Sequence, residues 1–188
     1  MGIEKGTMAT EGSHRLGRGY VQVYTGNSKG KTTAALGLAF RATGWGLRTY
    51  IGQFMKGQHY GELAAARMVH PHITIEQYGK DTFIHVRGSS EEDVGIARAG
   101  LARAKEVMCS GQYDIVVLDE ITTAHRFELV SVEEILEIAA LRPEGVELVL
   151  TGRYAPPEVI AVADLVTEMK VVKHYYDQGV GARDGIER

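Results

Sequence analysis

A short apolar strand, a glycine-bearing loop and a helix follow one another near the start of this chain, and they constrain its fold most. Val21 and Val23 lie in the strand, and the loop ends in Gly30-Lys31-Thr32, where a helix rich in Ala and Leu begins. This order is typical of a loop that binds phosphate groups. Glycines let backbone amides turn toward an anion, and the helix N-terminus adds the positive end of its dipole.

The side chains of this loop have separable expected roles. Lys31 supplies a mobile cation for phosphate oxygens, and Thr32 supplies a hydroxyl group for Mg²⁺. The usual pattern G-x-x-x-x-G-K-[ST] is displaced, because Thr25 stands at its first position and Gly26 follows it. A tight turn is the alternative, but the flanking strand and helix favour a nucleotide site. The residues predicted to bind the phosphates are Gly26, Asn27, Ser28, Lys29, Gly30, Lys31, Thr32 and Thr33.

Strand-like and helix-like segments alternate along the rest of the chain. The predicted strands are 20–24, 48–54, 73–78, 115–118, 147–150 and 165–171, and the predicted helices are 33–43, 62–68, 91–110, 132–141 and 157–163. The run 115–118 is continuously apolar, as expected of a strand that is buried on both faces. We therefore predict an α/β, single-domain P-loop NTPase (RecA-like) fold, with a mostly parallel sheet and helices on both faces.

Local signals mark where some of these helices begin. Ser89 with Glu92, and Ser131 with Glu134, each match the capping box of a helix N-terminus. Pro157 suits the first turn of the helix that it would open.

Length, charge and cysteine content narrow the class of protein. The 188 residues suit one domain, predicted at 19–188, with residues 1–18 as a flexible N-terminal arm. The net charge of -3 argues against a nucleic-acid partner, and no apolar run predicts a membrane segment. The single cysteine, Cys109, is expected to be a small core residue in a reduced, cytoplasmic setting. Trp45 is expected to be a packing anchor between a helix and a strand.

Polar residues directly follow two of the predicted buried strands. Asp119 and Glu120 come after the strand 115–118, where a carboxylate can face Thr32 and bind Mg²⁺, although which acid does so is open. Arg153 follows the strand 147–150 and is placed to meet a phosphate or a substrate carboxylate. The alternatives are an exposed acidic turn and a surface arginine.

Four motifs together resemble the P-loop type of ATP:corrinoid adenosyltransferase, over nearly the whole chain after about residue 18. They are the loop Thr25-Gly-Asn-Ser-Lys-Gly-Lys-Thr-Thr-Ala-Ala, Val117-Leu-Asp-Glu120, Leu150-Thr-Gly-Arg153, and Val172-Lys-His174 with Asp177, Gly179, Val180 and Gly185-Ile186. The displaced first glycine fits this resemblance, because the family's loop is similar to G-N-x-K-G-K-T-T.

The resemblance implies a reaction other than phosphoryl transfer. A Co(I) corrinoid, cobalamin or a precursor such as cobyrinic acid a,c-diamide, attacks the 5′ carbon of ATP, and triphosphate leaves. Lys31 would be catalytic, and Thr32 and Glu120 would be the best Mg²⁺ ligands, with Asp119 less certain. Phe83 matches the first aromatic of a Phe-x-Trp pattern that displaces the lower cobalt ligand in relatives, whereas His85 departs from the second. His85 is either a polar corrinoid contact or a structural residue.

Partners also follow from the resemblance: a reductant protein, and a homodimer in which residues 1–18 cover the neighbouring active site. Two other classes stay open, an ATP-switched binding module and a P-loop nucleoside kinase. Zinc-bearing kinases of that kind carry paired cysteines, which this chain lacks. The long segments 53–61 and 78–90 at the carboxyl edge favour a second small-molecule substrate.

Overall fold

The computed structural model describes residues 16–81 and 89–188 and contains one parallel sheet of six strands. The strands are β1 (Val21–Thr25), β2 (Thr49–Phe54), β3 (Ile73–Tyr78), β4 (Ile115–Asp119), β5 (Glu147–Thr151) and β6 (Leu165–Glu168). Their spatial order is β3-β2-β4-β5-β1-β6, and every neighbouring pair is parallel. The predicted α/β fold with a parallel sheet is confirmed.

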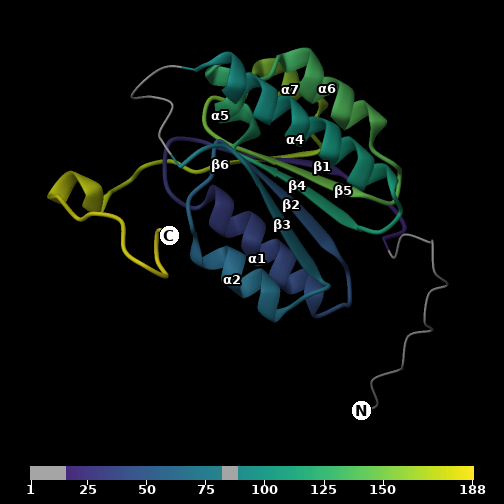
Figure 1. The fold of residues 1–188 in the computed structure, drawn as a ribbon, viewed down its shortest axis with the longest axis horizontal. Helices are drawn as coiled ribbons and strands as arrows, with labels where there is room; N and C mark the ends of the chain where they lie inside the picture. The colour runs from purple at the N-terminus through teal and green to yellow at the C-terminus, as the bar shows by residue number, and fades with distance from the viewer. Residues whose placement is uncertain (1–15, 82–88) are drawn as a thin grey trace, which may run out of the picture.

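Helices cover both faces of the sheet (Figure 1). On one face lie α1 (Lys31–Thr43) and α2 (Gly61–Met68), and on the other lie α4 (Glu91–Cys109), α5 (Ile121–Arg126), α6 (Val132–Leu141) and α7 (Pro157–Val162). A short 3-10 helix, Tyr175–Gln178, follows β6. None of the described helices is long and apolar enough to cross a membrane.

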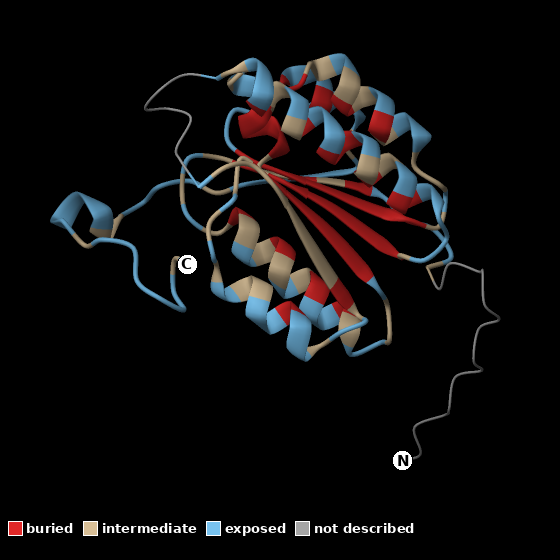
Figure 2. Ribbon diagram, viewed as in Figure 1, coloured by how far each residue is buried: buried red, intermediate tan, exposed pale blue. Residues whose placement is uncertain are grey.

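The central strand β4 shows why the sheet holds two hydrophobic cores. Its side chains alternate, so that Val116 and Leu118 pack toward α4 and α6, whereas Ile115 and Val117 pack toward α1. All five residues of β4 are buried, as Figure 2 shows for the middle of the sheet. A strand that is covered on both faces needs a continuous apolar run, and the prediction for 115–118 is confirmed.

Several predicted details need correction. The capping box of α4 is Ser90 with Asp93, one residue later than Ser89 with Glu92, while the box at Ser131 and Glu134 is confirmed. The helix α5 was not predicted, because no capping signature precedes it. The strand β6 ends at Glu168 rather than at residue 171, because its neighbour β1 ends at Thr25 and the chain there turns into the loop.

Two expectations about burial are wrong. Cys109 is exposed, because it lies on the outer side of the last turn of α4, where Val107 and Met108 fill the core instead. Trp45 is 83% exposed in the turn after α1, so it does not anchor the packing of this chain. The position of a residue in an element and its type were therefore not enough to predict the burial of either side chain.

Candidate functional site

The loop between β1 and α1 is held in shape by the backbone of the chain just after β6. The amide of Ser28 donates to the carbonyl of Met169 (3.1 Å), and the amide of Met169 donates to the carbonyl of Thr25 (2.8 Å). Gly26 has φ 99°, and a Cβ atom there would lie 2.4 Å from the Met169 carbonyl oxygen. Only glycine meets both conditions, so the loop depends on Gly26.

The first turn of α1 is left open to a ligand. Gly30 stands at its N-cap position with φ 126°, makes no side-chain capping bond, and is followed by no acidic residue in the first turn. The first amides of a helix have no partner within the helix, and its dipole attracts negative charge. The N-terminus of α1 is therefore suited to bind a phosphate group.

Lys31 lies folded over its own loop. It is 5% exposed, and its Nζ donates to the carbonyls of Gly26 and Ser28, at 2.8 Å each. Burial lowers the pKa of Lys31 most strongly, and the negative charge of Glu120 opposes that shift. The ammonium group thus contacts the backbone of the loop that is predicted to bind the phosphates.

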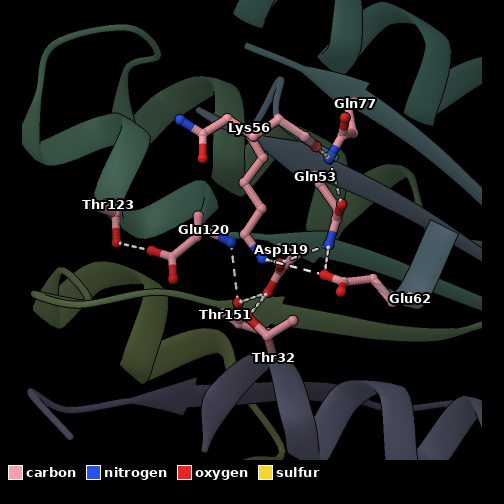
Figure 3. A network of polar contacts seen from close by, with 10 residues as sticks. Thr32, Gln53, Lys56, Glu62, Gln77, Asp119, Glu120, Thr123 and Thr151 are labelled. Atoms are coloured by element: carbon pink, nitrogen blue, oxygen red, sulfur yellow. Dashed lines mark hydrogen bonds and ion pairs between the residues drawn. The ribbon is translucent and has the colours of Figure 1, made fainter. Parts of the chain in front are cut away.

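Asp119, at the end of β4, is the hub of a buried polar network (Figure 3). Its Oδ1 accepts from the hydroxyl groups of Thr32 (2.8 Å) and Thr151 (2.7 Å). Its Oδ2 accepts from Nζ of Lys56 at 2.9 Å, and the Asp119 side chain is only 1% exposed. The network ties α1, β4 and β5 to the loop after β2.

Lys56 was not singled out from the sequence, although it lies in the segment 53–61 that favours a second small-molecule substrate. Burial lowers the pKa of Lys56, but the opposing attraction of Asp119 and Glu62 prevails, and the pKa is raised. Lys56 comes two residues after β2, and the carboxyl end of this strand faces the site. That position was the sequence signal that could have identified Lys56.

Glu120 and Arg153 lie at the ends of neighbouring strands and are both linked to α5. Glu120 has φ 62°, and its carboxylate accepts from the hydroxyl of Thr123 at 2.5 Å. The amide of Arg153 donates to the same hydroxyl at 2.8 Å, while the carbonyl of Arg153 accepts from Thr122. Both residues line a cavity in front of the phosphate loop.

A cavity of about 830 Å³ opens in front of the phosphate loop. Its polar part is lined by Ser28, Lys29, Gly30, Lys31, Thr32, Thr33, Lys56, Glu62, Glu120 and Arg153. Its apolar part lies between α1 and α2 and is lined by Leu36, Phe40, Ala65, Ala66, Met68, Val69, Ile73 and Ile75. Its volume is within the range of a small-molecule site.

The C-terminal segment forms another wall of this cavity. His174 and residues 185–188 line it, and Nζ of Lys29 donates to the carbonyl of Ile186 at 2.6 Å. Glu187 lies 3.5 Å from the same ammonium group and also pairs with Arg183. The segment is therefore attached to the phosphate loop itself.

The structure brings most of the predicted site residues together. The residues from Ser28 to Thr33, with Glu120 and Arg153, line one cavity, and Asp119 contacts Thr32 beside it. Gly26 shapes the loop, and Asn27 lies in it. Phe83 and His85 lie outside the described residues. Among the described residues, no three His, Cys, Asp or Glu side chains gather as a metal site.

Comparisons with known proteins match nearly the same part of the chain. A family model described as ATP:corrinoid adenosyltransferase BtuR/CobO/CobP matches residues 17–188. A corrinoid adenosyltransferase of Escherichia coli K12 is 35% identical over 171 residues, which cover 90% of this chain and 86% of that protein. Another from Sinorhizobium sp is 32% identical over 182 residues, covering 90% of this chain and 80% of that one.

Among solved structures, a KaiC-like protein of Pyrococcus horikoshii OT3 is similar in fold. Its TM-score is 0.55 at 17% sequence identity, and the match covers 84% of this chain and 75% of that one. At this identity the likeness concerns the fold alone, and it is consistent with the RecA-like arrangement predicted from the sequence.

Proposed function

The chain belongs to the ATP:corrinoid adenosyltransferase family, and from this premise we propose how its site transfers the adenosyl group of ATP to a corrinoid. The observation that carries the proposal is the open first turn of α1, which faces a cavity of about 830 Å³. The triphosphate of ATP would bind at that turn, and the remaining volume would take the adenosine and one edge of the second substrate.

The reaction needs charge stabilisation more than proton transfer. A lone pair on Co(I) forms the bond to the 5′ carbon, the bond from that carbon to oxygen breaks, and its electron pair stays on the leaving triphosphate. No proton moves in this step, so no general acid or base is required. Lys31 and the amides at the start of α1 would stabilise the added negative charge, as donors do in an oxyanion hole.

The donor set beside the loop fits Mg²⁺. Thr32 and Asp119 offer hard oxygen atoms that lie within a hydrogen bond of each other, and Glu120 lines the same cavity. We propose that Thr32 and Glu120 hold the ion, with Asp119 acting on Thr32. When bound, Mg²⁺ would neutralise part of the triphosphate charge.

The corrinoid side of the site rests on the resemblance. We propose that Phe83 excludes the lower axial ligand of cobalt and that His85 contacts the corrinoid, with cobalamin or cobyrinic acid a,c-diamide as the substrate. Truncation of Phe83 to Ala should then slow the reaction that starts from Co(II) with an external reductant more than one that starts from prepared Co(I). Spectra of the Co(II) complex should show less four-coordinate species in the variant. An unchanged four-coordinate fraction would reject this role for Phe83.

Other parts of the proposal concern the surroundings of the enzyme. Four points stay predictions. They are a reductant protein, a homodimer, a cytoplasmic location, and the division into an arm at 1–18 and a domain at 19–188. The dimer can be measured by light scattering, and the arm by comparing the activity of a chain that begins at residue 19.

A spectroscopic assay tests the proposed function directly. The absorbance of a corrinoid under reducing conditions should change on adding ATP, and inorganic triphosphate should appear in equal amount. Release of ADP with a phosphorylated nucleoside would instead indicate the kinase, and ATP binding without turnover would indicate the switched binding module.

A further inference from the structure

Lys56 is held in place by an unusually close contact between two loops at the carboxyl edge of the sheet. A Cβ atom on Gly57 would lie 2.5 Å from the carbonyl oxygen of Gly79, and one on Gly79 would lie 2.5 Å from the amide nitrogen of Lys56. Met55, just before Lys56, has φ 59°. The backbone that carries Lys56 therefore has a defined path, which both glycines make possible.

The side chain of Lys56 points from this loop toward the phosphate site (Figure 3). Its Nζ lies 2.9 Å from Oδ2 of Asp119 and 3.8 Å from Oε1 of Glu62, and the side chain is 15% exposed. It lines the same cavity as the phosphate loop, and its ammonium group lies over the ring of Tyr60. Burying the charge of a lysine costs free energy unless the charge is paired or binds a ligand.

The pairing with Asp119 leaves the ammonium group able to bind more. Lysine has three donors, and one of them is directed to Asp119. The other oxygen of Asp119 is occupied by the hydroxyls of Thr32 and Thr151. Asp119 therefore fixes one cation next to Thr32, and through Thr32 next to the open turn of α1.

We propose that Lys56 is a further catalytic residue that contacts the triphosphate of ATP and stabilises the charge that triphosphate gains on leaving. This inference rests on the proposed adenosyl transfer. Lys31 lies within the loop, and Lys56 reaches the cavity from the end of β2, so the two cations approach the triphosphate from different elements. Donors that are already fixed before the substrate binds need little reorganisation during the reaction.

The test measures binding of inorganic triphosphate by calorimetry, with and without Mg²⁺ and with no corrinoid. Lys56→Met should weaken this binding roughly ten- to a hundred-fold, since a hydrogen bond to a charged group is worth about 1.5–3 kcal/mol. The matched control is Lys105→Met, which removes a lysine paired with Glu137 that does not line the cavity, and it should bind triphosphate like the unaltered protein. Equal affinity of the Lys56 and Lys105 variants would overturn the proposal.

A second measurement covers the case in which Lys56→Met does not fold, because it leaves Asp119 without its cation. In the unaltered protein labelled with ¹³C at lysine, the Cε signal of Lys56 should shift on adding triphosphate, and Lys56→Arg, which keeps the charge, assigns that signal by its loss. A Lys56 signal that does not move would reject the contact. Because neither measurement contains a corrinoid, failure of the absorbance assay would reject the transfer reaction and leave the result for Lys56 standing.

Discussion

The helices α1, α4 and α6 begin in two different ways, and the difference distinguishes a binding site from a structural helix end. At α4 and α6 a serine accepts from a backbone amide, an acid at the third position accepts in return, and further acids fill the first turn. At α1 the cap is Gly30, and neither a capping side chain nor an acid is present. In a helix with a capping box, side chains of the helix itself accept from the first backbone amides. In a helix without one, those amides lack an acceptor, and a bound phosphate can supply it.

The comparison also supports the role that we propose for Lys31. An acid in the first turn of α1 would repel the triphosphate, and the place is taken instead by a buried lysine that contacts the carbonyls of Gly26 and Ser28. The same turn carries Thr32, which binds the carboxylate of Asp119. At α1 the nearby carboxylate of Asp119 accepts from the hydroxyl of Thr32, and the first turn itself carries no acid.

The largest effect is expected from a change in the open first turn of α1, and it tests whether this turn takes part in the reaction. Lys31→Ala should reduce the rate of adenosylation by about 10²–10³, because one strong contact to a developing anion is lost. Rates would be measured from the corrinoid absorbance, with circular dichroism as the control for folding. Turnover near that of the unaltered enzyme would mean that the open turn is a structural feature only.

A smaller effect is expected from closing the loop sterically. Gly26→Ala places a Cβ atom 2.4 Å from the Met169 carbonyl oxygen at a φ of 99°, and the left-handed region alone costs about 1–2 kcal/mol. ATP affinity should fall roughly ten-fold, which calorimetry would measure. The control is Gly95→Ala in α4, where a Cβ atom meets nothing within 4 Å. Equal ATP affinities in the two variants would contradict the tight fit of the loop.

The two acids at the carboxyl end of β4, Asp119 and Glu120, sharpen the comparison further. Glu120→Gln should raise the Mg²⁺ concentration needed for half-maximal rate several-fold, and by more than Asp119→Asn does. Asp119→Asn should mainly lower thermal stability, since it removes the nearer of the two charge partners of Lys56, and breaking a buried pair costs about 3–5 kcal/mol. Titration of Mg²⁺ against rate, with melting curves, separates the two. A larger Mg²⁺ shift for Asp119→Asn would show that Asp119 is the ligand.

The smallest effect should come from a closed helix start. Ser131→Ala removes the capping box of α6 and should lower the free energy of unfolding by about 1 kcal/mol, with no change in rate. Urea unfolding gives the first quantity and the absorbance assay the second. A change in rate would mean that the self-capped helices are coupled to the site.

The sequence predicted the part of the site that depends on local order. A strand, a glycine loop and Lys31-Thr32 are adjacent in the chain, so their arrangement follows from local geometry. The bounds of β3 and α6 agree with the prediction, because their patterns are regular and their ends are marked. The burial of Asp119 and its bond to Thr32 fit the expectation that a carboxylate after the predicted strand 115–118 faces this threonine.

The parts of the site that could not be predicted depend on contacts between segments that are distant in the sequence. Lys56 reaches Asp119 only because β2 lies beside β4, and no local pattern states which neighbour a strand takes. The brace from Met169 and the wall formed by residues 185–188 likewise come from the far end of the chain. Trp45 and Cys109 were misjudged for the same reason, since their exposure depends on which elements pack beside them.

The brace between Ser28 and Met169 has a consequence for how the protein matures during synthesis. The amide of Ser28 belongs to the phosphate loop, but the carbonyl that accepts from it belongs to Met169, which lies 141 residues further along the chain. The strand β1 before this loop pairs with β5 and β6, which follow the other strands of the described sheet along the chain. A nascent chain therefore cannot complete this loop before Met169 has been made, and nucleotide that binds the completed loop cannot support the earlier stages of folding.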